Sequence, residues 1–157
     1  PDKILWSGSK FEKVNKFLPI FSSKYCIKPG LPINYAPCKT YEVDEVHGRG
    51  VLIPSSAISK IGNYDFENFP HYGGDDEFSA RVKRFGFGLY VLPEAIVYLD
   101  NVESQSKKKI LTSFFNVKSN IKIINKWNFS KSTVPFYCIP TYYLIAVIKS
   151  IFVFLRR

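Results

Sequence analysis

Residues 71–94 have the sequence HYGGDDEFSARVKRFGFGLYVLPE, in which two glycines are followed by three acids, Asp75–Glu77. Carboxylates are favoured in the first turn of a helix, where unpaired N–H groups and the helix dipole attract negative charge. Gly86 is suited to end this helix because glycine adopts a positive φ without strain. Phe87–Leu92 is then typical of a strand. The stretch therefore predicts a loop, an acid-capped helix and a strand, as in an α/β protein.

The spacing of the side chains predicts the faces of this helix. Phe78, Val82 and Phe85 recur at helical spacing, so we expect them to face the core. Lys83 and Arg84 follow near the C-terminal end, where positive charge is favoured. Two interpretations of the unit remain open. It is either an acid-capped structural helix or a catalytic carboxylate on a Gly-Gly loop that lets a substrate approach the backbone.

The residues before this unit predict a loop and a short helix. In the sequence HGRG at 47–50, small residues permit close approach of the backbone, and Arg49 could hold a phosphate or sugar hydroxyls through its planar fork. An exposed turn is the alternative. The apolar run Val51–Ile53 predicts a buried strand. Residues 54–61 predict a helix, and Gly62 is suited to end it.

The remaining parts of the first 100 residues have weaker patterns. Residues 3–7 predict a strand that enters a turn at Gly8, and residues 10–45, interrupted by prolines and glycine, predict loops with short strands. Residues 43–46 could form a strand with two acids at its end, which lie either on a solvated edge or against acceptor hydroxyls. Ala95–Leu99 is rich in β-branched residues and predicts another strand.

The charge of the chain is concentrated in its last third. The 157 residues carry a net charge of +9. Residues 1–100 contain 12 Lys and Arg and 12 Asp and Glu, whereas residues 101–157 contain ten Lys and Arg and a single acid, Glu103. This asymmetry points to an anionic partner for the C-terminal segment, either a membrane surface or a nucleic acid.

The C-terminal segment combines an apolar and a basic stripe at helical spacing. The apolar residues step by four and three along one face: Ile110, Phe114, Val117, Ile121 and Ile124. The lysines step by four along another: Lys118, Lys122 and Lys126. Such a helix either lies on an anionic leaflet or packs on the body of the protein. Trp127 is correspondingly either a headgroup anchor or core.

Residues 134–155 are mostly apolar and just long enough to span a bilayer. Lys149 lies inside this stretch and costs roughly 3 kcal/mol near the centre of a span. Two prolines also interrupt its first turns. We therefore expect a membrane-embedded or membrane-lying helix rather than a span, with Arg156 and Arg157 on the cytoplasmic side.

Several of these motifs, in this order, resemble family 2 glycosyltransferases, most closely the bacterial rhamnosyltransferase-like subgroup. The motifs are VHGRGVLIP at 46–54, IGNYD at 61–65, and FPHY at 69–72 followed by DDEFSAR at 75–81. The resemblance implies an α/β fold, the C-terminal part of an A-type (Rossmann-like) glycosyltransferase domain, followed by a helical basic and apolar tail.

The resemblance also implies how the chain is divided. Residues 1–103 correspond to the acceptor-side half of the catalytic domain, and residues 104–157 to a membrane-associating tail. The nucleotide-binding half, with its Asp-x-Asp element, would precede residue 1, so we expect the chain to be a fragment. The implied location is the cytoplasmic face of the cell membrane, with a peripheral or membrane-embedded C-terminal helix.

The activity implied is an inverting transfer of a hexosyl or rhamnosyl group from a nucleoside-diphosphate sugar to a hydroxyl of a glycan or lipid-linked acceptor, in cell-surface polysaccharide synthesis. Asp75, six residues before Arg81, is the implied catalytic base. The implied substrate-binding residues are Gly48, Arg49, Gly50, Gly74, Asp76, Glu77 and Arg81. A divalent cation, Mg²⁺ or Mn²⁺, is implied for the full-length enzyme, with ligands mostly outside this chain and no metal ligand assigned here.

Two hypotheses from other classes stand beside this one. The chain could be a non-catalytic module that binds an acceptor or a membrane and lacks the nucleotide-binding half. Nucleic-acid binding is disfavoured because aromatic residues do not interleave with the basic stripe as a base-stacking platform requires. The expected partners are therefore a nucleoside-diphosphate sugar, a glycan or lipid-linked acceptor and an anionic membrane surface, with no nucleic acid.

Overall fold

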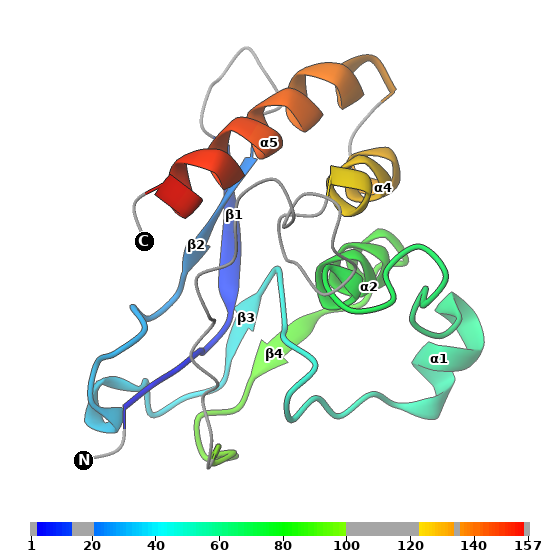
Figure 1. Ribbon diagram of the computed structural model, residues 1–157. Helices are drawn as coiled ribbons and strands as arrows, with labels where there is room; N and C mark the ends of the chain where they lie inside the picture. The colour runs from blue at the N-terminus through cyan, green and yellow to red at the C-terminus, as the bar shows by residue number, and fades with distance from the viewer. Residues whose placement is uncertain (1–2, 14–20, 100–122, 134–135, 156–157) are drawn as a thin grey trace. The chain divides into compact units, whose positions relative to one another are not determined.

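The computed structural model describes residues 3–13, 21–99, 123–133 and 136–155. Within these ranges it is a mixed α/β structure with four helices and two small two-stranded antiparallel sheets (Figure 1). The α/β class predicted from the sequence is confirmed at this level, while no Rossmann-like parallel sheet is present in the described ranges.

The chain divides into two compact units. The first comprises Pro1–Asn63 and Phe78–Asp100, and the second comprises Tyr64–Glu77 and Asn101–Arg157. The chain therefore passes from one unit to the other more than once, and one of these passages lies within a helix.

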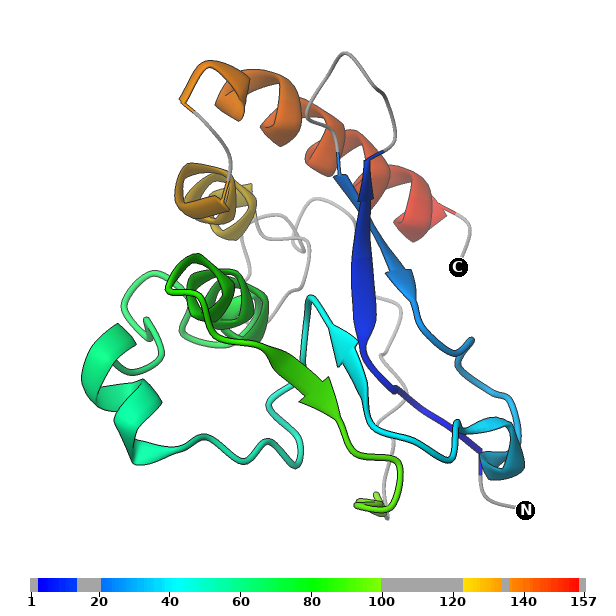
Figure 2. The same ribbon diagram turned by 180° about the vertical axis from the view of Figure 1, so that it is seen from behind.

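Both sheets belong to the first unit. Their strands are β1 (Ser9–Lys13), β2 (Phe21–Tyr25), β3 (Tyr41–Val43) and β4 (Leu89–Val91). β1 pairs with β2, and β3 pairs with β4. The sheets meet where β1 begins, because the Asp44 N–H donates to Ser9 O at 2.9 Å. Figure 2 shows β3 beside the start of β1. The short strands predicted within residues 10–45 are confirmed. The described part of this stretch also contains a 3-10 turn, η1 (Ile33–Tyr35), that was not predicted.

Gly8 is required where the chain enters β1. Its φ is +83°, and a Cβ at this position would lie 2.5 Å from Cγ1 of Val43, which is fully buried. The predicted turn at Gly8 is confirmed. The strand predicted for residues 3–7 is wrong, because that segment forms only an isolated bridge from Lys3 to Pro32.

The two helices predicted from local signals are confirmed. α1 (Ser55–Ile61) follows Pro54 and ends at Gly62, whose φ is +80°. α2 (Gly74–Arg84) has three acids in its first turn and three cations in its last. Gly86 follows α2 with a φ of +80°, as expected for a C-cap glycine.

The core of the first unit includes one face of α2. Phe78 and Val82 are buried, as predicted, but Phe85 is 47% exposed and the prediction for it is wrong. Phe85 follows the last residue of α2, and its N–H still donates to Arg81 O at 3.1 Å, so the helical backbone reaches Phe85 although its side chain is exposed.

The apolar runs on either side of these helices do not form the strands predicted for them. Val51–Ile53 is irregular, and Leu52 is 96% exposed. Ala95–Leu99 is also irregular and exposed, and β4 is shorter than the predicted Phe87–Leu92. Gly50, the residue before the first run, lies close to Val97 in the second: a Cβ on Gly50 would lie 2.6 Å from Val97 Cγ2.

The described part of the C-terminal segment is helical, as predicted. It contains α4 (Ile123–Thr133), the 3-10 turn η2 (Phe136–Cys138) and α5 (Ile139–Leu155). The Trp127 ring of α4 meets the Tyr143 ring of α5 edge-on at 5.2 Å. Among the described residues, none of the helices has both the length and the apolar character needed to cross a membrane.

Most of the predicted amphipathic stripes fall outside the described residues. These positions are Ile110, Phe114, Val117, Ile121, Lys118 and Lys122. Ile124 and Lys126, the last members of the two stripes, lie in α4.

Candidate functional site

The acidic residues singled out by the sequence form the first turn of α2. Asp75 and Asp76 are half-buried, and Glu77 is only 4% exposed. The backbone enters the helix through Gly73, whose carbonyl accepts the Glu77 N–H at 3.0 Å. These residues belong to the second unit. Their carboxylates lie where the unpaired N–H groups of the helix start favour negative charge.

The two glycines before the acids have different roles. Gly73 has a φ of +88°, and a Cβ there would lie 3.2 Å from the ring of Phe69, which is buried. Gly74 is helical, and a Cβ there would make ordinary contacts, at 3.6 Å from Phe69 and 3.9 Å from Tyr64. The turn therefore requires glycine at position 73, whereas position 74 has room for a side chain.

The loop that leads to Gly73 is held by side-chain hydrogen bonds within the second unit. The Asp65 carboxylate accepts the Asn68 N–H at 3.0 Å and its side-chain amide at 2.8 Å. From α4, Asn125 Nδ2 donates to Tyr72 O at 3.0 Å, and Asn128 Nδ2 donates to Asn68 O at 3.4 Å. α4 thus fixes both the middle and the end of the loop that precedes the acids.

Tyr64 interacts electrostatically with Asp75, and this interaction was not predicted from the sequence. Burial raises the pKa of the Tyr64 phenol, and the negative charge of Asp75 raises this pKa further. The phenol and the carboxylate are therefore close enough to interact electrostatically. The two residues are eleven positions apart, and only closure of the intervening loop brings them together, so no local pattern signals the pair.

Arg81 secures the end of α1. Its Nη1 donates to Ile61 O and its Nη2 to Asn63 O, both at 2.8 Å, and its guanidinium lies 5.4 Å from the centre of the Phe78 ring. A cation at a helix C-terminus satisfies carbonyls that have no partner within the helix. Arg81 thus has a structural role that the sequence did not predict, and its contact with substrate stays a prediction.

The glycine loop at 48–50 lies in the first unit and is exposed, including Arg49. Gly50 has a φ of +79° and packs against Val97, so this glycine is required for steric reasons. His47, just before the loop, stacks on Trp6 with ring centroids 4.5 Å apart. Val46, the residue before His47, donates its N–H to the Ser79 hydroxyl of α2 at 3.1 Å.

The predicted substrate-binding residues are thus divided between the units. Gly48–Gly50 and Arg81 belong to the first unit, and Gly74–Glu77 belong to the second. Within the second unit the structure brings Gly74, Asp75, Asp76 and Glu77 together with Tyr64. The exposed Arg49 and the half-buried Asp75 are both open to solvent in part, as groups that contact a substrate need to be.

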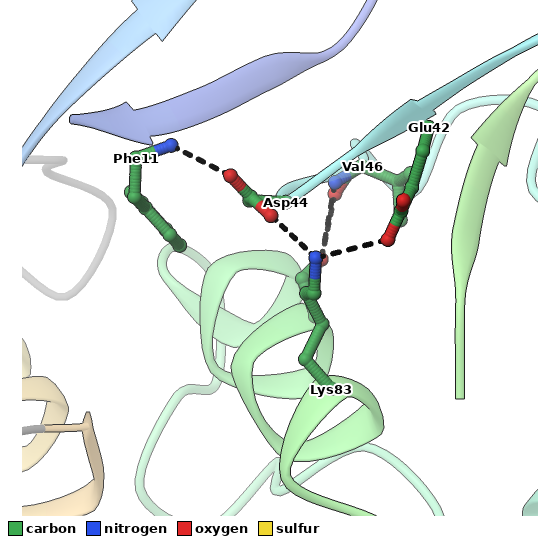
Figure 3. Close-up of polar contacts among 6 residues, drawn as sticks. Phe11, Glu42, Asp44, Val46 and Lys83 are labelled. Atoms are coloured by element: carbon green, nitrogen blue, oxygen red, sulfur yellow. Dashed lines mark hydrogen bonds and ion pairs between the residues drawn. The ribbon is translucent and has the colours of Figure 1, made fainter. Parts of the chain in front are cut away.

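Lys83 of α2 forms an ion cluster with the acids of β3 and its extension (Figure 3). Its Nζ lies 2.5 Å from Asp44 Oδ1 and 3.3 Å from Glu42 Oε1, and Asp44 Oδ2 accepts the Phe11 N–H at 2.9 Å. Burial would raise the pKa of Asp44, but hydrogen bonds from Lys83 and Phe11 and the charge of Lys83 lower it below its ordinary value. The hydrogen bond to Asp44 raises the pKa of Lys83.

The neighbouring acid, Glu45, has a similar structural environment. Its carboxylate accepts hydrogen bonds from the hydroxyls of Ser9 and Ser23. The two acids at the end of β3 therefore bind groups of the first unit rather than lying on a solvated edge. The alternative in which they contact acceptor hydroxyls stays a prediction.

The described residues contain no group of three or more His, Cys, Asp or Glu side chains placed to hold a metal ion. The divalent cation implied by the resemblance is therefore not matched by a donor set in this part of the chain, and no chemical step is assigned to it here. No protein-family model, no curated protein and no solved structure matches the chain.

Proposed function

We propose that this chain is the acceptor-side part of an inverting glycosyltransferase of the A-type, Rossmann-like fold. It would move a sugar from a nucleoside-diphosphate sugar to a hydroxyl of a glycan or lipid-linked acceptor in the synthesis of a cell-surface polysaccharide. The proposal rests on the resemblance of the motifs at 46–54, 61–65 and 69–81 to family 2 glycosyltransferases.

One observation carries the proposal: the Gly73 turn presents Asp75, half-buried, in the first turn of α2, where its negative charge adds to the effect of burial in raising the pKa of Tyr64. A general base needs a carboxylate that is held in place and still reachable from solvent. Asp75 would take the proton of the acceptor hydroxyl while the hydroxyl oxygen forms its bond to the anomeric carbon. The nucleoside diphosphate would leave from the opposite face with the bonding electrons.

The other acids receive different roles. Glu77 is buried, which suits support of the turn better than contact with an acceptor hydroxyl. Asp76 is half-buried and stays a candidate for binding the acceptor. Arg49 is exposed, and its planar fork suits the diphosphate of the donor.

The proposal is tested by transfer assays on the full-length enzyme, with a panel of nucleoside-diphosphate sugars and a hydroxyl acceptor that the wild type is first shown to use. Asp75→Asn is expected to lower the rate by about 10²- to 10⁴-fold, the contribution typical of general base catalysis. Glu67→Gln removes the same charge from an exposed acid of the same unit and is expected to keep the wild-type rate. Equal rates for the two variants, with folding verified by circular dichroism, would show that Asp75 is not the base.

Binding of the donor is tested separately by following backbone amide shifts while a nucleoside-diphosphate sugar is added, with and without Mn²⁺. Saturable shifts at Gly48–Gly50 and at Gly73–Glu77 are expected. A folded chain that shows no shifts with any donor would remove the donor site from this chain.

A non-catalytic binding module is the second candidate, favoured by the structural roles of two residues in the motif. The Arg81 guanidinium binds the carbonyls of Ile61 and Asn63, and Glu77 is buried, so both serve the fold. Such a module would bind a glycan acceptor saturably and bind no nucleoside-diphosphate sugar. The amide titration separates the two candidates.

A further inference from the structure

The outward face of α5 is apolar. Its exposed residues Leu144, Ile148 and Phe152 follow one another at intervals of four, and their exposed fractions are 59%, 43% and 59%. Residues at this spacing lie above one another along one side of a helix. The side of a surface helix that faces solvent ordinarily carries polar residues, whereas the exposed side of α5 carries apolar ones.

This apolar face is distinct from the face that α5 uses within its own unit. Tyr143 meets Trp127 of α4 edge-on, one residue before Leu144 and therefore about 100° away around the helix. Cys138, at the start of the helical segment, is 7% exposed. The contacts with α4 thus leave the stripe from Leu144 to Phe152 uncovered in the described part of the chain.

Two aromatic residues in the 3-10 turn before the helix are also exposed. Phe136 and Tyr137 of η2 are 88% and 79% exposed. Five large apolar or aromatic side chains are therefore exposed over two consecutive elements. We call them the α5 surface: Phe136, Tyr137, Leu144, Ile148 and Phe152.

Positive charge accompanies the α5 surface. Lys149 is exposed on α5 next to Ile148, and Lys131 is exposed near the end of α4. The second unit as a whole contains ten Lys and Arg and six Asp and Glu, a net charge of +4. An apolar helix face with lysines beside it is the pattern by which helices lie in the plane of a membrane surface.

We propose that the α5 surface binds an anionic lipid bilayer, with the apolar side chains among the acyl chains and the lysines at the headgroups. The positive charge favours anionic lipid over a neutral apolar protein surface, because a lysine near the membrane is attracted to a negative leaflet by about 1 kcal/mol. This inference does not depend on the glycosyl transfer proposed above, since neither Asp75 nor the Gly73 turn takes part in it.

The test measures cosedimentation of the full chain with two kinds of vesicle, phosphatidylcholine alone and phosphatidylcholine mixed with an equal part of phosphatidylglycerol. The chain is expected to bind the mixed vesicles, to bind phosphatidylcholine much more weakly, and to lose affinity as NaCl screens the charges. Binding that is equal for both vesicles, or absent from both, would overturn the proposal. A chain that forms dimers and binds neither vesicle would show that a second copy covers the surface.

A matched pair of variants locates the binding surface. Leu144→Glu on α5 and Leu52→Glu in the first unit change the same residue type and add the same charge, and Leu52 is the more exposed of the two. Leu144→Glu is expected to weaken binding to the mixed vesicles by about tenfold or more, because an acid would enter the apolar layer beside anionic headgroups. Leu52→Glu is expected to have a much smaller effect. Equal effects would mean that the α5 surface is not the site.

A second pair of variants tests the same surface in case Leu144→Glu does not fold. Phe136→Glu changes a side chain that is 88% exposed and therefore contributes little to the core, and Phe66→Glu makes the same change at a side chain of the same unit that is 73% exposed. Only Phe136→Glu is expected to reduce vesicle binding. If Phe136→Glu binds as well as Phe66→Glu, the aromatic end of the α5 surface does not enter the bilayer and the proposal is wrong.

Discussion

Gly73 holds the turn that presents the acidic residues. Its φ of +88° is strained for any residue with a Cβ, and the Phe69 ring leaves little space for one. Gly73→Ala is expected to destabilise the protein by about 1–3 kcal/mol, the usual cost of a strained backbone conformation. Gly74→Ala, at a helical position with ordinary contacts, is expected to be neutral or slightly stabilising because alanine favours helix. Urea denaturation of the two variants measures the difference.

The variants Gly73→Ala and Gly74→Ala also distinguish a structural role of glycine from a role in substrate binding. If Gly74→Ala keeps its stability and loses donor or acceptor binding, close approach of a substrate to the backbone is the reason for glycine at that position. Equal stability of Gly73→Ala and the wild type would contradict the described turn.

Tyr64 and Asp75 form the second prediction at this scale. The negative charge of Asp75 contributes to the raised pKa of the phenol, after the larger effect of burial. Asp75→Asn is therefore expected to lower the pKa of Tyr64 part of the way toward its ordinary value. Spectrophotometric titration at alkaline pH, compared with a Tyr64→Phe control that identifies the contribution of this one tyrosine, measures the change. An unchanged pKa would mean that the two groups do not interact.

Between elements, Lys83 connects α2 to β3. Its removal leaves Asp44, whose side chain is 23% exposed, without its cation. Lys83→Met is expected to destabilise the protein by about 1–2 kcal/mol. This figure already includes solvent screening, because the Lys83 side chain is one third exposed. In the double variant with Asp44→Asn the two effects are expected to be less than additive. Strict additivity in denaturation experiments would show that the pair contributes no coupling.

The pH dependence of this pair has a definite sign. The pKa of Asp44 lies below its ordinary value of 3.8, so the stabilisation from Asp44 is present above that pH and is lost as the pH falls through its lowered pKa. The pKa of Lys83 lies above its ordinary value of 10.5, so its stabilisation is present below that pH and is lost as the pH rises through the raised pKa. The difference in stability between wild type and Lys83→Met is therefore expected to be constant at neutral pH and to shrink in strong acid.

Helices were predictable from this sequence because their signals are local. Pro54 precedes α1 and Gly62 ends it, while the three acids begin α2 and Gly86 follows its end. Each signal thus lies within a few residues of the helix end that it marks. Strands were less predictable because a strand depends on its partner as well as on its own residues. Ala95–Leu99 has the composition of a strand, but in the described part of the chain it finds no partner and remains exposed.

The candidate site was predictable to a similar extent. The acids at the start of α2 and the glycine turn before them follow from one short stretch of sequence. Three interactions depend on residues 11 to 39 positions apart: the effect of the Asp75 charge on Tyr64, the bonds from Arg81 to α1, and the pairing of Lys83 with Asp44. Such contacts are fixed by tertiary packing, which the local sequence does not encode.

At the scale of the whole molecule, α2 belongs to both units. The boundary falls between Glu77 and Phe78, in the middle of one continuous helix. Because helix formation is cooperative, loss of α2 in one unit is expected to remove it from the other. We therefore expect the two units to unfold in a single transition.

One tryptophan in each unit makes this prediction measurable. Trp6 lies in the first unit and Trp127 in the second, and the chain has no other tryptophan. The variants Trp6→Phe and Trp127→Phe each leave one reporter, and their fluorescence transitions are expected to coincide with the transition seen by circular dichroism of the same variant. Two separate midpoints within one variant would show that the units unfold independently.

Acidic and basic residues are concentrated in different segments of the second unit. Residues 64–77 contain five acids and no Lys or Arg, and they share a unit with residues 101–157, which contain ten Lys and Arg and one acid. The most acidic part of the chain is thus assigned to the same unit as the most basic part. The acids offset part of the positive charge of that unit, and the remaining +4 favours binding to an anionic surface.

The bonds of Arg81 have a consequence for the order of folding. They join Arg81 to Asn63 across 18 positions of the chain and so close the loop that contains the acids. Loops of about ten residues close within roughly 10–100 ns, and the entropy of closure grows only slowly with length. Closing this loop costs about 0.8 kcal/mol less entropy than closing the 46 positions between Val43 of β3 and Leu89 of β4. The segment that carries Asp75 is therefore expected to be enclosed somewhat more readily than β3 and β4 pair, because its two ends are closer along the chain.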